Sequence, residues 1–191
     1  MRKITRADVR GPRLYSGFRD DLRKRAIEVK RPRRIGVGPI VTLVFENRTT
    51  VLFQIEEMLR VEHIEDDAGI QHEIDTYNEL VPDAGELSAS LFVEVTETAQ
   101  IRPTLQRLVG LDQHVFLDVG ETAVRAVFEA GRQEDERISA VQYLRFRLPE
   151  AAQTTLRTPG TRLRLRIDHP AYPHTTDLDD LTRSSLATDL D

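Results

Sequence analysis

Two segments of the chain alternate apolar side chains with arginines, and this pattern restricts the possible fold more than any other feature. From Tyr143 to Leu148, leucine and phenylalanine alternate with tyrosine and arginine; from Arg162 to Ile167, leucine and isoleucine alternate with arginine. A period of two places successive side chains on opposite faces of a strand. Both segments therefore predict strands of a sheet with one buried and one charged face, which is typical of antiparallel sheets.

Weaker patterns predict the remaining elements. Further strands are expected at residues 35–46, 91–96, 115–119 and 124–128. Helices are expected at residues 12–29, 52–62, 70–81 and 102–109. Because helices and strands do not alternate regularly, the sequence predicts an α+β fold: a largely antiparallel mixed sheet of about six strands with three or four helices.

We expect a single domain over residues 1–191. Leu, Ile, Val and Phe supply 55 of the 191 residues, enough apolar side chains to build a sizeable core. Within this domain we expect a basic helical N-terminal arm (1–34), an α+β core (35–174) and an acidic, partly disordered tail (175–191). A polar loop is expected at residues 131–137.

Basic and acidic residues are unevenly distributed along the chain. Residues 1–34 contain 13 Lys and Arg against 4 Asp and Glu, whereas residues 46–97 contain 14 acids against Arg48 and Arg60. This asymmetry predicts that the arm docks onto the acidic middle, within one chain or across a homodimer. The alternatives are a solvated basic face and a nucleic-acid or membrane partner, but no nucleic-acid motif is present.

Leu14, Phe18 and Leu22 recur at helical spacing on the predicted first helix. Such a stripe needs burial against another surface. We therefore expect this helix to contribute to a homodimer contact.

Several classes of chemistry lack the residues they need. The sequence has no cysteine, which excludes disulfides, thiol catalysis, thiolate-bound zinc and iron–sulfur clusters, and we expect no haem. Motifs for nucleophilic hydrolysis, zinc proteolysis, phosphate cradling and dinucleotide binding are absent, as is the Glu-x-x-His pair of di-iron carboxylate proteins. With no long apolar run and no secretory signal, we expect a cytoplasmic protein without a membrane partner.

The segment from Asp168 to His174 is the best candidate for a metal site. His169 and His174 lie beside a carboxylate on a segment restricted by two prolines, and could hold a divalent metal or position a proton shuttle. The third ligand is expected from the second predicted helix, with Glu62 preferred. Other possible metal ligands on or beside that helix are Glu56, Glu57 and His63. In the alternative interpretation, His169 caps the strand end and Tyr172 fills the core beneath it.

Glu62 continues the apolar stripe of Leu52, Ile55 and Leu59 on the second predicted helix. A carboxylate in such a position must be paired or have a raised pKa. We expect an ion pair with an arginine of the sheet. The alternative is an acid that faces a ligand in a cleft between helix and sheet.

If the two alternating strands are neighbours, five arginines share one face of the sheet. These are Arg145, Arg147, Arg162, Arg164 and Arg166. Their mutual repulsion requires compensation, and the acidic helices at residues 50–81 are the expected cover. The candidate binding residues are Arg60, Glu62, Tyr143, Arg145, Asp168 and Tyr172.

Five segments are distinctive in combination. They are Leu43–Arg48, Gln54–Glu62, Asn78–Pro82, Tyr143–Phe146 and Ile167–His174. Together they resemble the bacterial domain of unknown function 3501 family over nearly the whole chain. The resemblance implies an association with rubrerythrin-like and iron–sulfur oxidoreductase proteins, whose genes often neighbour those of this family. His63 stands where the family is expected to carry arginine, which argues against His63 as a shared metal ligand.

These observations lead to one main functional interpretation and two alternatives. The main one is a non-catalytic accessory or binding protein in bacterial redox or peroxide-stress metabolism. The first alternative is a metal-dependent enzyme that uses the segment Asp168–His174. The second is an anion or nucleic-acid binder that uses residues 1–34.

Overall fold

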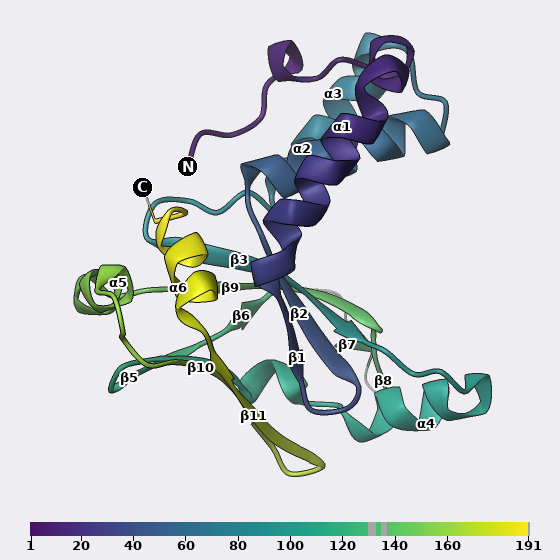
Figure 1. The fold of residues 1–191 in the computed structure, drawn as a ribbon. Coiled ribbons are helices and arrows are strands. Elements are labelled where there is room, and N and C mark those ends of the chain that lie inside the picture. The colour runs from purple at the N-terminus through teal and green to yellow at the C-terminus, as the bar shows by residue number, and fades with distance from the viewer. Residues whose placement is uncertain (130–132, 135–136, 191) are drawn as a thin grey trace.

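A computed structural model describes residues 1–129, 133–134 and 137–190 of the chain (Figure 1). The α-helices are α1 (Pro12–Lys30), α2 (Arg48–Val61), α3 (Asp67–Asn78), α4 (Thr98–Arg107), α5 (Glu150–Arg157) and α6 (Asp180–Ala187). The strands are β1 (Arg34–Val37), β2 (Val41–Glu46), β3 (Glu86–Val93), β4 (Val115–Val119), β5 (Thr122–Arg125), β6 (Val127–Phe128), β7 (Gln133–Glu134), β8 (Arg137–Ile138), β9 (Val141–Arg147), β10 (Leu163–His169) and β11 (Tyr172–Leu178). Within these residues, no helix is both long and apolar enough to cross a membrane.

The strands form antiparallel sheets, which confirms the predicted α+β class. One sheet has the order β1-β2-β3-β9-β6 and a second has the order β11-β10-β4-β5, while β7 and β8 pair separately. Part of the predicted loop at residues 131–137 is therefore the β7–β8 pair, and residues 131, 132, 135 and 136 lie outside the described residues.

The two larger sheets meet at both sides. On one side the segment Thr122–Phe128 pairs first with β4 and then with β9, so it passes from one sheet to the other. On the other side the Thr176 hydroxyl of β11 donates a hydrogen bond to the Gly36 carbonyl of β1 over 2.8 Å. Apolar side chains of both sheets, together with residues of α4, α5 and α6, form one continuous core.

The segment predicted as one strand at residues 35–46 is a hairpin of β1 and β2. The chain reverses at Gly38, whose φ is +72°, in the left-handed region that favours glycine. A Cβ atom at this position would lie 2.6 Å from ring atoms of His174 and from the Tyr172 hydroxyl. The reversal therefore depends on glycine both for its backbone angle and for the close approach of β11.

The two arginine-alternating strands, β9 and β10, belong to different sheets, so the predicted face of five arginines does not form. Their charges are compensated mainly by acids on neighbouring strands. Arg147 contacts Glu86 of β3 at 2.9 Å, and Arg166 contacts Asp118 of β4 at 3.0 Å. Compensation by the helices at residues 50–81 was the wrong expectation, because an antiparallel partner strand places its own side chains directly opposite.

Helices α1, α2 and α3 stand together as a separate bundle at one end of the strands (Figure 1). This bundle has its own apolar cluster, which includes Ile55 and Leu59 of α2 and Ile74 of α3. The basic arm contacts the acidic middle within the same chain, as when Arg19 of α1 meets Glu57 of α2 at 2.7 Å. Hydrogen bonds from Arg19 lower the pKa of Glu57 to about 2.

Residues 175–190 are ordered, contrary to the predicted partly disordered tail, and α6 was not predicted. The buried positions of α6 are Thr182, Arg183 and Leu186, so its inner face carries no apolar stripe. Arg183 is 4% exposed and donates to the Leu156 carbonyl of α5 over 2.8 Å. Helix α5 was missed for a related reason, since its buried face consists of Ala152 and Leu156 alone.

Beyond α6, Asp189 forms a buried ion pair with Arg33, which lies between α1 and β1. The Arg33 Nη1 atom is 2.6 Å from Asp189 Oδ2, and the two side chains are 2% and 1% exposed. Arg33 also donates to the Ser185 carbonyl over 2.6 Å. The C-terminal segment is thereby held against the end of α1.

We expect Arg33→Ala to lower the free energy of unfolding by about 3–5 kcal/mol, because Asp189 would be left buried without its counter-charge. The matched control is Arg34→Ala. Arg34 pairs with Glu94 at half-exposed positions, and an exposed pair contributes about 0–1 kcal/mol. Urea denaturation of both variants measures the difference. Equal, small losses in the two variants would show that the buried pair does not hold the C-terminal segment.

Candidate functional site

The segment Asp168–His174 forms the turn between β10 and β11, and its side chains are engaged in holding that turn. The Nδ1 atom of His169 accepts a hydrogen bond from the Ala171 N–H over 3.2 Å, so Nε2 carries the proton and donates to the Val109 carbonyl over 3.0 Å. Both ring nitrogens are therefore occupied by protein groups. This arrangement agrees with the interpretation of His169 as a cap of the strand end.

Tyr172 lies in the core beneath this turn and is 3% exposed. Its hydroxyl donates to the Val37 carbonyl over 2.8 Å and accepts hydrogen bonds from the N–H groups of Ile40 and Val41 over 3.0 and 3.2 Å. The hydroxyl thus satisfies three backbone groups of the β1–β2 turn. Tyr172 fastens one sheet to the other and is not available to a ligand.

The structure does not bring the predicted metal ligands together. His174 packs its ring against the ring of Tyr172 at 4.3 Å, while Asp168 bonds His114 Nδ1 and an Arg166 nitrogen, each over 2.8 Å. Glu62 lies in the helical bundle, at the end of α2. Across the described residues, no group of three or more His, Asp or Glu side chains could hold a metal ion together.

Glu62 is exposed, which contradicts the predicted burial and ion pair. Helix α2 ends at Val61, and His63 adopts a φ of +55° while the Ile64 N–H bonds back to the Leu59 carbonyl over 3.0 Å. This C-terminal turn carries Glu62 away from the buried stripe. Because α2 ends at Val61, Glu62 does not continue the apolar stripe that the sequence pattern predicted.

The buried acid of α2 is Glu56, which is 1% exposed. Its carboxylate accepts hydrogen bonds from the backbone N–H groups of Arg10 and Gly11 over 2.6 and 3.2 Å. Burial raises the pKa of Glu56. Arg60, a predicted binding residue on the same helix, pairs with Glu57 at 3.2 Å.

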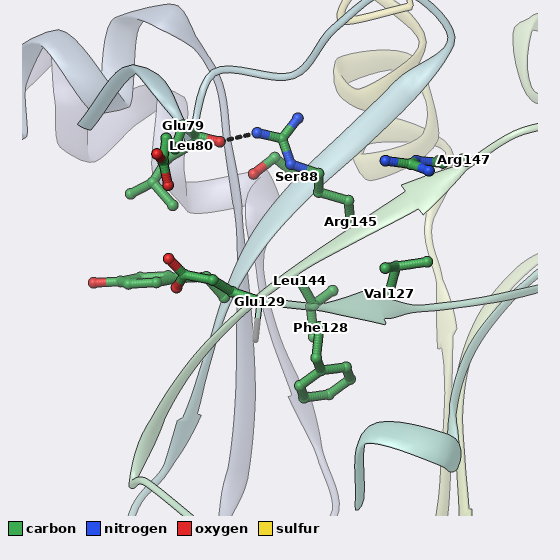
Figure 2. Close-up of a pocket in the computed structure, with 10 residues that line it drawn as sticks. Glu79, Leu80, Ser88, Val127, Phe128, Glu129, Leu144, Arg145 and Arg147 are labelled. Carbon is green, nitrogen blue, oxygen red and sulfur yellow. Dashed lines mark hydrogen bonds between the residues drawn. The ribbon is translucent and has the colours of Figure 1, made fainter. Parts of the chain in front are cut away.

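A cleft of 210 Å³ lies between the α3–β3 loop and the outer face of the five-stranded sheet. Its lining comes from that loop and from strands β3, β6 and β9 (Figure 2). The lining residues are Glu79, Leu80, Ser88, Val127, Phe128, Glu129, Tyr143, Leu144, Arg145 and Arg147. Two predicted binding residues, Tyr143 and Arg145, are among them, and Arg60, Glu62, Asp168 and Tyr172 are not.

Arg145 is held rigidly in the wall of this cleft. Its Nη1 atom lies 2.9 Å from Glu86 and 3.5 Å from Asp83, and its Nη2 atom donates to the Glu79 carbonyl. Glu86 also binds Arg147 at 2.9 Å. Arg145 therefore fixes the α3–β3 loop to the sheet, and its own charge is already balanced by acids.

The remaining surface of the cleft combines acids with apolar groups. The carboxylates of Glu79 and Glu129 lie on one side, across from Val127 and Arg147 (Figure 2). Val127 is 49% exposed and adds an apolar side chain to this surface. Glu79 forms no ion pair within the described part of the chain. A ligand that suits this surface carries a positive group next to an apolar one.

No pattern in the sequence indicates the acids of this cleft. Glu79 follows the end of α3 and Glu129 follows the two-residue strand β6, and neither belongs to a periodic pattern. A cleft between helix and sheet was one of the expectations for Glu62. The cleft in the structure lies instead between the α3–β3 loop and the sheet, and Glu79 of that loop lines it, whereas Glu62 does not.

Comparisons with known proteins give a family and a fold. A family model described as a protein of unknown function, DUF3501, matches residues 3–190. A search of curated proteins finds no match. The crystal structure of a novel protein of unknown function from Burkholderia pseudomallei K96243 is 38% identical, covers 100% of both chains and has a TM-score of 0.93.

We expect Tyr172→Phe to lower the free energy of unfolding by about 2–3 kcal/mol, because buried backbone groups of the β1–β2 turn would lose their partner. Tyr77→Phe serves as the control, since the Tyr77 hydroxyl meets the side chain of Gln54 at a half-buried position, and we expect it to cost below about 1 kcal/mol. Thermal unfolding of both variants measures the two losses. A Tyr172→Phe variant as stable as the parent would contradict the structural role.

Proposed function

The chain belongs to the DUF3501 family of proteins of unknown function, and we propose that it acts as a non-catalytic binding protein whose ligand occupies the cleft between the α3–β3 loop and the sheet. The observation that carries the proposal is a cleft with one fixed wall and, beside it, a carboxylate and an apolar side chain that are both exposed. Arg145 holds the wall in place, while the Glu79 carboxylate and the exposed Val127 side chain remain open to a ligand.

The chemistry of the cleft favours binding over catalysis. Glu86 forms ion pairs with both Arg145 and Arg147, so the charges of these three side chains compensate one another. A preformed wall of this kind reduces the entropic cost of binding. The segment Asp168–His174, the basis of the metal-enzyme alternative, is used in the β10–β11 turn.

The ligand of this proposal carries an ammonium or guanidinium group beside an apolar group. A lysine or arginine side chain in a loop of a partner protein has that chemistry. We extend the proposal to a partner in bacterial redox or peroxide-stress metabolism, a rubrerythrin-like or iron–sulfur oxidoreductase protein of the cytoplasm, which is the association that the resemblance implies. Because the chain has no cysteine, it has no thiol with which to carry out redox chemistry itself, and this agrees with an accessory role.

We include a homodimer in the proposal, because part of the apolar stripe of α1 is not covered within one chain. Leu14 is 65% exposed and Phe18 is 54% exposed. The residues of α1 that pack against the rest of the chain are instead Tyr15 and Ala26, which lie on an adjacent face of the helix. Association of two copies through α1 would bury both exposed side chains.

The cleft is tested with phenethylamine, which combines an ammonium group with an apolar ring. We expect it to shift the backbone amide resonances of Leu80, Ser88 and Leu144, and Glu79→Gln to weaken its binding about fivefold through loss of one exposed charge pair. Glu62→Gln is the control, because it removes the same charge outside the cleft. Absence of shifts at the cleft, or equal weakening in both variants, would contradict the proposal.

The same two variants test the redox setting. Tagged parent protein, expressed in its native host, is expected to retain a rubrerythrin-like or iron–sulfur protein that Glu79→Gln loses and Glu62→Gln keeps, as identified by mass spectrometry. Retention by all three proteins would place the partner elsewhere on the surface. No redox protein with any of them would remove the redox part of the proposal.

The homodimer is tested by light scattering at high micromolar concentration. We expect the parent to have the mass of two chains and the double variant Leu14→Ser, Phe18→Ser to have the mass of one, because exposed ion pairs alone contribute about 0–1 kcal/mol each. Val61→Ser, at a 58% exposed position of α2, should leave the dimer intact. A monomeric parent excludes the dimer.

A further inference from the structure

A second cavity, of 160 Å³, lies between α1 and the first half of α2, separate from the cleft described above. It is lined by Arg10, Leu22, Arg25, Arg48, Thr49, Leu52, Phe53 and Glu56. Three arginines therefore come together from three elements: the segment before α1, α1 itself and the first turn of α2. No other class of charged residue is as frequent in this wall.

The charges of these arginines are poorly balanced by the protein. Arg25 forms no ion pair within the described residues. Arg10 places its guanidinium over the Phe18 ring, 5.5 Å from the ring centre, and forms no ion pair in the described part of the chain, while its charge opposes the rise in the pKa of the nearby Glu56 carboxyl. Like charges held this close repel each other unless an anion lies between them.

The acids nearest the cavity are already engaged elsewhere. The carboxylate of Glu56 accepts from the backbone N–H groups of Arg10 and Gly11, so it binds the main chain and no guanidinium. Asp8 lies 2.6 Å from Arg48, but it also binds Arg2 at 2.8 Å and the Thr5 N–H at 2.9 Å. Its charge is divided among these donors, which leaves the cavity positive.

Arg48 also carries a donor without an acceptor. Its Nε atom is buried and makes no hydrogen bond to any described residue. A buried N–H group without a partner costs free energy, so in native proteins it is usually met by a ligand or a water molecule. Because Nε and Nη2 are both screened from solvent, an anion in the cavity would meet Arg48 through Nη1.

The rest of the wall is apolar. Leu22, Leu52 and the ring of Phe53 face the same cavity as the arginines. A simple inorganic anion would leave this part of the surface uncovered. An apolar or aromatic group attached to the anion would contact it and be removed from water.

We propose that this cavity binds a small organic anion, in which a phosphate or carboxylate group meets Arg10, Arg25 and Arg48 and an attached apolar group contacts Leu52 and Phe53. Guanidinium groups recognise both head groups through paired hydrogen bonds. The site lies within the basic arm and its contact with α2. It is independent of the cation-binding cleft, because the two share no residue.

The proposal is tested with phenyl phosphate on the full chain, followed by amide resonances and by calorimetry. Phenyl phosphate is expected to shift the amides of Thr49, Leu52 and Phe53 and to bind more tightly than inorganic phosphate or benzyl alcohol. The anion 3-phenylpropionate tests the carboxylate head group in the same way. Binding of neither aromatic anion at millimolar concentration would overturn the proposal, as would equal binding of phenyl phosphate and inorganic phosphate.

Two matched variants locate the site. Arg25→Gln removes a charge from the cavity wall and is expected to weaken phenyl phosphate binding about tenfold. Arg23→Gln removes the same charge from the same helix but outside the cavity, and is expected to change binding less than about twofold. Both positions are exposed, so both variants should fold, as circular dichroism can verify.

Equal weakening by Arg25→Gln and Arg23→Gln would mean diffuse attraction of anions to the basic arm, and would overturn the assigned site. Glu79→Gln, the cleft variant, should bind phenyl phosphate as the parent does. The two sites can therefore fail separately: loss of phenethylamine binding says nothing against the anion site, and loss of phenyl phosphate binding says nothing against the cleft.

Discussion

The buried ion pair between Arg33 and Asp189 joins parts of the chain that are 156 residues apart, and the placement of three helices depends on it. Arg33 ends the segment that follows α1, and Asp189 follows α6. Asp189 also meets the side chain of Asn47, the residue that caps α2. Burial raises the pKa of the Asp189 carboxyl, and the Arg33 guanidinium opposes that rise. Because either charge alone would be costly to bury, α1, α2 and α6 are held in one arrangement.

Both candidate binding surfaces involve the helical bundle or the loop that leaves it. The bundle of α1, α2 and α3 stands on the sheet, so a cleft opens where the α3–β3 loop passes over β9, and a cavity opens where α1 leaves the first half of α2. The cleft is edged by the acids Glu79 and Glu129, and the cavity by three arginines. The two proposals therefore assign ligands of opposite charge to the cleft and to the cavity.

Charge pairing across neighbouring strands explains how a chain so rich in arginine keeps a regular sheet. Arg147 meets Glu86 across the β3–β9 pair, and Arg166 meets Asp118 across the β4–β10 pair. These contacts leave the basic groups of the arm as the main unbalanced charges near a cavity. The Burkholderia pseudomallei protein shares the fold over its full length.

The elements that the sequence predicts best are those whose burial follows a simple period: the strands β9 and β10 and the first three helices. Two of the residues that it proposed for binding, Tyr143 and Arg145, line the cleft. Only the tertiary structure decided which strands share a sheet, that Glu56 and not Glu62 is buried, and that residues 175–190 are ordered. For the buried charges the physical reason is the same. Burial of a charged side chain depends on a partner from elsewhere in the chain: Glu56 is covered by Arg10 and Gly11, and Asp189 by Arg33. A periodic pattern predicts which side of an element is apolar. It does not predict which distant segment will supply the hydrogen bonds or the counter-charge that a buried charge needs.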